Sequence, residues 1–128
     1  MKLLLDTHTF LWVIDNDTKL SPKSRTLIED VNNEIYVSAA SLWEMAIKIS
    51  IGKLVLRQSF DLFIPQQLRL NSIKLLGISV EHIATIINLP FYHRDPFDRL
   101  IIAQLMVEQI PVVSVDSVFD SYNVTRLW

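Results

Sequence analysis

The chain has no cysteine and only two glycines, Gly52 and Gly77, among its 128 residues. Without cysteine it can form neither disulfide bonds nor thiolate metal sites, and nothing indicates an oxidising compartment. With so few glycines it has no glycine-rich loop of the kind that cradles a nucleotide phosphate. No apolar run approaches the roughly 18 residues of a membrane span, and the apolar start is too short for a secretory signal. We therefore expect a soluble, cytoplasmic protein with no membrane partner.

An excess of positive charge is also missing. Twelve basic and fourteen acidic residues give a net charge of -2, whereas proteins that hold nucleic acid by overall charge are basic. Any contact with nucleic acid must be local or bridged by a metal ion. Half of the residues are hydrophobic, and a mean hydropathy of +0.29 is high for a small domain, so we expect a partner to cover some apolar surface. The length suits one domain, residues 1–128.

Short apolar runs alternate with segments of helical pattern. Strands are expected at residues 2–5, 34–38, 72–76 and 111–115, with a last edge strand near residues 123–124. Helices are expected after residue 6, at 22–31, at 39–48, at 54–70 with a kink or break at Pro65, at 80–88 and from residue 96 or 97. This order predicts an α/β fold, a three-layer α/β/α sandwich with a mainly parallel central sheet.

Acidic residues stand where these strands end and where the helices begin. The first strand ends at Asp6 and the 111–115 strand ends at Asp116, while Asp98 lies in the first turn of the most apolar helix. Glu44 follows Ser41 at the spacing of a capping box. Each acid therefore has two interpretations, a helix cap worth about 1 kcal/mol or a side chain of a site at the carboxyl edge of the sheet.

The cap is the stronger interpretation for Asp95, because Pro96 follows it and proline suits the first helical position. The other four carboxylates would repel one another strongly if they met in a partly dry cleft, unless protons or cations neutralised them. Oxygen ligands without histidine or cysteine favour Mg²⁺ or Mn²⁺. Such an ion binds a phosphodiester and activates water, so it would let an acidic protein act on nucleic acid.

Four segments resemble the motifs of PIN-domain ribonucleases, and more closely those of VapC-type toxins of type II toxin–antitoxin modules. They are LLLDTHTFLW (3–12), SAASLWE (38–44), HRDPFDRLIIAQ (93–104) and SVDSVF (114–119). The resemblance implies a PIN-like fold and an Mg²⁺- or Mn²⁺-dependent endoribonuclease that cuts RNA with metal-activated water, leaving a 5′-phosphate and a 3′-hydroxyl. It also implies a homodimer and a cognate antitoxin protein whose tail covers an apolar groove and blocks the acids.

The same resemblance assigns roles to eight residues of this chain. The catalytic and metal-binding acids are Asp6, Glu44, Asp98 and Asp116, with Asp6 and Asp98 as the surest metal ligands and Asp116 as the weakest. We also expect Arg99 and His93 to contact the RNA phosphate, and Thr7 and Ser114 to orient the metal ligands.

Two other functions remain open. A catalytically silent binding module would use every acid as a helix cap. An acid-pocket phosphotransfer domain of the haloacid type needs a second aspartate two residues after the strand-end acid, and this chain has His8 there. A receiver domain needs paired acids near the first strand, which are not evident. His82 has no second histidine at ligand spacing, so we expect a structural role for it.

Overall fold

The computed structural model describes residues 1–128, and helices and strands alternate along most of the chain. The strands are β1 (Lys2–Leu5), β2 (Glu34–Ser38), β3 (Ile73–Leu76), β4 (Val112–Val113) and β5 (Arg126–Leu127). The helices are α1 (Thr7–Ile14), α2 (Pro22–Glu29), α3 (Ala39–Ser50), α4 (Phe60–Leu70), α5 (Val80–Ile86), α6 (Pro96–Glu108) and the 3₁₀ turn η1 (Ser117–Ser121).

The sheet has five strands in the order β3-β2-β1-β4-β5, and every neighbouring pair is parallel. From β1 the chain builds outward through β2 to β3, and then returns to the other side of β1 for β4 and β5. The strand order therefore reverses between β1 and β4. In open parallel sheets, the carboxyl ends of the two strands at such a point border a crevice in which ligands bind.

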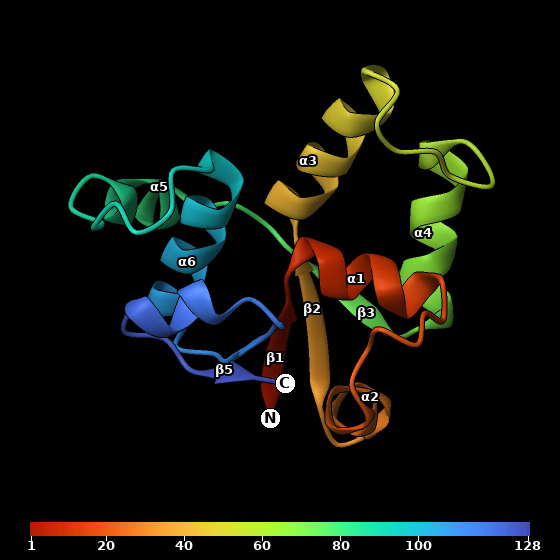
Figure 1. Ribbon diagram of the computed structural model, residues 1–128, viewed down its shortest axis with the longest axis horizontal. Coiled ribbons are helices and arrows are strands. Elements are labelled where there is room, and N and C mark those ends of the chain that lie inside the picture. Colours follow the sequence, from red (N-terminus) through yellow and green to blue (C-terminus); the bar gives the residue numbers. More distant parts are fainter.

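Alternating side chains of β1 divide the core between the two faces of the sheet. Leu3 and Leu5 pack in one cluster with α1 and α4, while Leu4 packs in the other with α6 and η1. Figure 1 shows α1 and α4 on one side of the strands and α5 and α6 on the other. Because residues i and i+2 of a strand share a face, an apolar run such as LLL serves both layers. The predicted three-layer α/β/α sandwich is confirmed.

The structure corrects the sequence-based boundaries at a few points. α4 is continuous through Pro65, so the helix is not split there. Phe63 and Ile64 are buried beside it, and this tertiary packing offsets the backbone hydrogen bond that proline cannot donate. The last strand lies at Arg126–Leu127, three residues later than expected. The helix starts at Ser21-Pro22, Ser79 and Asp95-Pro96 are confirmed, because each named cap accepts from a first-turn amide. No helix is long and apolar enough to cross a membrane.

Candidate active site

The hydroxyl of Ser114 connects the end of β1 to the turn that follows β4 through hydrogen bonds to Asp6 and Asp116. Asp6 caps α1, with Oδ1 accepting from the backbone N–H of Thr9 at 2.9 Å. Its Oδ2 accepts from the hydroxyl of Ser114 at 2.5 Å, and the same hydroxyl oxygen accepts from the backbone N–H of Asp116 at 3.0 Å. Asp6 is buried, with 7% of its surface exposed. Two strand ends far apart in sequence are therefore held together at the crevice.

Glu44 reaches the same place from α3. α3 begins at Ala39 as predicted, and its cap is Ser38, so the capping-box interpretation of Ser41 and Glu44 is wrong. One carboxylate oxygen, Oε1, instead accepts from the hydroxyl of Thr7 at 2.8 Å. The other, Oε2, lies 3.1 Å from Nζ of Lys48. Since Thr7 directly follows Asp6 in sequence, Glu44 belongs to the same edge of the sheet.

Asp98 completes the group from the first turn of α6. Asp95 caps this helix as predicted, accepting from the backbone N–H groups of Phe97 and Asp98 at 2.8 and 3.2 Å. Burial, followed by the negative charges of Asp95, Glu44, Asp6 and Asp116, raises the pKa of Asp98 from 3.8 to about 7. The carboxylate of Asp98 thus lies within electrostatic reach of the other three acids, because distant charges would be screened.

His93 lies between Asp98 and Asp116. Its Nε2 is 3.6 Å from Oδ2 of Asp116 and 4.0 Å from Oδ2 of Asp98. The ring is stacked on Tyr122 and tilted against Phe119, and 9% of the residue is exposed. Neither ring nitrogen has a hydrogen-bond partner. A buried polar atom without a partner costs about 1–3 kcal/mol, so these nitrogens are candidates for contact with a bound group.

Arg99 lies elsewhere than expected. It is 5% exposed, and its guanidinium donates to four backbone carbonyls of the preceding segment, those of Pro90 (2.8 Å), Leu89 (3.0 Å), His93 (3.3 Å) and Ile86 (3.5 Å). This placement argues against the expected phosphate contact, because the donors are already engaged. Arg99 instead fixes the loop that carries His93. The apolar residues around it in sequence were the signal that it would be buried.

Two residues of this region were not singled out from the sequence. Tyr122 accepts from the backbone N–H of His93 at 2.8 Å and donates to the carbonyl of Pro90 at 3.2 Å, so its hydroxyl also holds the His93 loop. Lys48 lies one helical turn after Glu44, and that four-residue spacing is the usual one for an ion pair on a helix. Only the spacing could have drawn attention to Lys48, and nothing in the sequence pointed to Tyr122.

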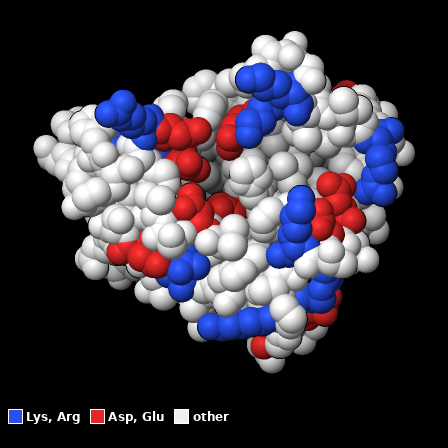
Figure 2. All heavy atoms as spheres, viewed as in Figure 1, with Lys and Arg blue, Asp and Glu red and all other residues white.

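Acidic side chains surround a hollow on one face of the molecule (Figure 2). Figure 2 shows red side chains around a hollow near the middle of this face, between the positions of α3 and α6 in Figure 1, with basic side chains at its rim. Carboxylates are the ligands that Mg²⁺ and Mn²⁺ prefer, and the unpartnered imidazole of His93 faces them. The donor set therefore fits such an ion in kind. As the side chains lie, no three of them form a ready-made metal-binding group.

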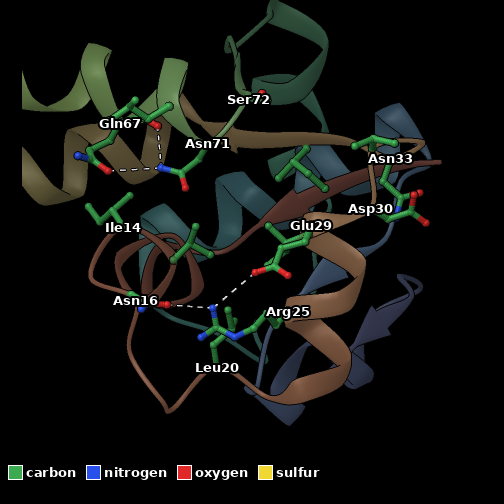
Figure 3. Close-up of a pocket in the computed structure, with 15 residues that line it drawn as sticks. Ile14, Asn16, Leu20, Arg25, Glu29, Asp30, Asn33, Gln67, Asn71 and Ser72 are labelled. Carbon is green, nitrogen blue, oxygen red and sulfur yellow. Dashed lines mark hydrogen bonds and ion pairs between the residues drawn. The ribbon is translucent and has the colours of Figure 1, made fainter.

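A pocket elsewhere on the protein is a separate feature. It measures about 590 Å³ and lies between α1, α2 and α4, where the sheet begins rather than where it ends. Figure 3 shows Arg25 in it, reaching Asn16 at 3.0 Å and Glu29 at 3.7 Å, with Ile14 and Leu20 nearby. None of the four candidate acids lines it. Its size is that of a ligand pocket, and its lining is partly apolar and partly polar.

Known proteins resemble this chain in sequence and in fold. The model of the PIN domain family matches residues 3–124. The chain belongs to the PIN domain family. A curated relative, ribonuclease VapC16 of Mycobacterium tuberculosis, is 34% identical over 62 residues, a match that covers 48% of this chain and 44% of the relative. The aligned region is therefore less than half of either protein.

Solved structures share the fold of this PIN domain over nearly its whole length. VapBC2 of Rickettsia felis, bound to a DNA fragment from its promoter, contains a chain with a TM-score of 0.73 at 17% identity, covering 99% of this chain and 98% of that one. FitAcB of Neisseria gonorrhoeae gives 0.67 at 15% identity, covering 98% and 96%. VapBC-1 of nontypeable Haemophilus influenzae gives 0.66 at 14% identity, covering 99% and 97%. At these identities the likeness establishes the fold alone.

Proposed function

We propose that this PIN domain is a divalent-metal-dependent endoribonuclease and the toxin of a type II toxin–antitoxin module. The observation that carries the proposal is the gathering of Asp6, Glu44, Asp98 and Asp116 from four separate segments at one crevice. Carboxylates that act on one another strongly enough to raise the pKa of Asp98 are costly to maintain for packing alone. The curated relative named a ribonuclease supports RNA as the substrate.

Each side chain would have a distinct part in this reaction. Asp6 and Asp98 would hold Mg²⁺ or Mn²⁺, with Glu44 and Asp116 as further ligands or water-orienting groups. The ion would lower the pKa of the attacking water and stabilise charge on the leaving oxygen. Thr7 and Ser114 would keep Glu44 and Asp6 in orientation through the hydroxyl contacts already described.

His93 would meet the scissile phosphate. Its nitrogen faces Asp98 and Asp116, and the ring is held by Tyr122 and by the loop fixed through Arg99. An N–H in this position would bind an oxygen of the phosphate between the acids. We assign Arg99 the fixing of the loop in place of the phosphate contact expected from sequence.

We further propose a cognate antitoxin and a homodimer as partners, in the cytoplasm. Several apolar side chains that would be covered are exposed along α5 and the loop after it, namely Val80 (84%), Ile83 (55%), Ile87 (79%) and Phe91 (79%). The pocket of Figure 3 is a second surface that a partner segment could fill. The solved structures similar to this chain include toxin–antitoxin complexes.

A catalytically silent binding module is the second candidate. It is favoured by the fact that Asp6, Asp95 and Asp116 each accept from a first-turn amide and so cap a helix. Glu44 and Asp98 have no such capping role, which is why we prefer the nuclease. Membership of the PIN family leaves the phosphotransfer alternative without support.

Incubation of the purified protein with RNA distinguishes the two candidates. We expect cleavage only with added Mg²⁺ or Mn²⁺, with loss of cleavage in Asp98→Asn while the circular dichroism spectrum stays unchanged. A fully active Asp98→Asn protein would refute the assignment. If Asp6→Ala lowers thermal stability, while neither Asp6→Ala nor Asp98→Ala alters metal binding or RNA cleavage, the silent module is correct.

A further inference from the structure

The acid cluster has one lysine or arginine within ion-pair distance. Nζ of Lys48 lies 3.1 Å from Oε2 of Glu44, whereas Asp6, Asp98 and Asp116 have no such partner. The Glu44 side chain is 13% exposed and that of Lys48 is 36% exposed. The ammonium group is thus the more exposed member of the pair, and it can move without unpacking the helix.

The pair occupies a carboxylate that the proposed reaction needs. One oxygen of Glu44 accepts from Thr7 and the other faces Lys48, so neither oxygen is free of a partner. An ammonium group 3.1 Å from Oε2 repels an incoming divalent ion and competes for the same oxygen, so metal binding through Oε2 favours departure of the lysine. Partly exposed ion pairs are worth about 0.2–1 kcal/mol, and the lysine stem is flexible, so this displacement costs little.

The site also lacks the phosphate-binding cation that was expected from the sequence, because Arg99 does not supply it. Arg99 is committed to backbone carbonyls, and Arg126 is paired with Asp120 and with the carbonyl of Ser114. Lys48 is therefore the cation in direct contact with one of the four acids. The unpartnered imidazole of His93 is a second, independent sign that a ligand enters here. Lysine is a common phosphate contact in nucleic-acid complexes, and its charge would be unpaired once a metal ion held Glu44.

We propose that Lys48 exchanges partners during the reaction cycle. In the metal-free protein it neutralises Glu44. When a divalent ion binds Glu44, the ammonium turns to a phosphate of the RNA chain. This inference rests on the proposed function, because it requires a metal ion and RNA at the same crevice.

Metal binding tests the first half of the exchange. Isothermal titration calorimetry with Mn²⁺ and no RNA should give about two- to fivefold tighter binding for Lys48→Met than for the wild type, because the competing cation is gone. Lys48→Arg keeps the charge and should bind Mn²⁺ like the wild type. Lys74→Met is a matched control, since Lys74 forms an ion pair of 2.9 Å with Glu34 at the start of β2, and its affinity should not change.

A double-mutant cycle checks that the effect passes through Glu44. In a Glu44→Gln background, Lys48→Met should leave the Mn²⁺ affinity unchanged, because the pair no longer exists. An equal gain in both backgrounds would mean that Lys48 acts by general charge alone and would overturn the exchange. Unchanged or weaker Mn²⁺ binding by Lys48→Met in the wild-type background would overturn it as well.

RNA kinetics tests the second half. At saturating Mn²⁺, Lys48→Met should raise KM for a single-stranded RNA about tenfold, with a smaller change in kcat. The slope of log(kcat/KM) against log salt concentration should become shallower by about one. An unchanged KM and salt slope would overturn the phosphate contact. A wild-type protein that binds no Mn²⁺ and cuts no RNA would instead refute the proposed function, and the exchange with it.

Discussion

Replacing Asp98 with asparagine should remove cleavage and at the same time stabilise the protein. Burial and the neighbouring acids raise the pKa of this carboxyl group from 3.8 to about 7. Between pH 3.8 and about pH 7, the folded protein keeps a proton on Asp98 that the unfolded chain has lost. The free energy of unfolding therefore falls as the pH rises through this range. Asparagine cannot ionise and avoids this loss. The variant should therefore be the more stable protein above pH 7.

The size of the effect follows from the pKa. One pH unit corresponds to about 1.4 kcal/mol, so the full shift would be worth about 4 kcal/mol above pH 7. The side chain is 31% exposed, which weakens the effect, and loss of a negative charge at the start of α6 costs about 0.3–1 kcal/mol. We expect a net gain of about 1–3 kcal/mol, or about 5–10 °C in Tm for a chain of this length.

Urea unfolding followed by circular dichroism, in buffer with a chelator, measures this gain at pH 5 and pH 8. The stability difference between Asp98→Asn and the wild type should be small at pH 5 and should widen toward pH 8. Asp95→Asn is a suitable control, because asparagine caps a helix as well as aspartate does while removing a charge that raises the pKa of Asp98; it should give a smaller gain. A variant no more stable than the wild type at pH 8, or a difference independent of pH, would refute this reasoning.

Three further substitutions test other contacts of the site. Ser114→Ala removes the donor to Asp6 and should lower the free energy of unfolding, measured by chemical denaturation, by about 1–2 kcal/mol. It should also lower kcat for RNA at least tenfold, and an unaltered kcat would contradict the orienting role. Thr7→Val keeps the shape but removes the donor to Glu44, and weaker Mn²⁺ binding in calorimetry is expected, whereas unchanged binding would speak against it. Arg99→Met leaves buried carbonyls without a donor and should lower the free energy of unfolding by about 3 kcal/mol or more. A variant of normal stability with impaired RNA binding would instead support the phosphate contact expected from the sequence.

Much of the fold could be predicted because it depends on local patterns. The LLL run of β1 indicated a strand buried on both faces, and the structure places its side chains in both core clusters. The Asp95-Pro96 pair predicted the start of α6, since capping and proline preference act within one helical turn. The strand-end position of Asp6 likewise followed from where the first apolar run stops, whereas β4 already ends at Val113, so Asp116 lies in the turn after it and caps η1.

The site needed contacts that no local pattern contains. The Ser41–Glu44 spacing matched a capping box, yet Glu44 accepts from Thr7, 37 residues away. The sequence suggested that Arg99 contacts the RNA phosphate, yet its guanidinium donates to the backbone carbonyls of a loop folded against α6. Whether a polar side chain binds a ligand or a neighbouring carbonyl depends on which segments pack beside it.

The sequence by itself determined the secondary structure, the apolar faces of the layers and the acids at the element ends, because these depend on side-chain periodicity and on hydrogen bonds within a few residues. The tertiary structure alone decided that β4 lies beside β1, which brings Asp116 to Asp6 through Ser114. It also decided that Glu44, with Lys48 beside it, meets Thr7 at the end of β1. Both outcomes arise from strand order and helix packing, which bring together segments that are distant along the chain.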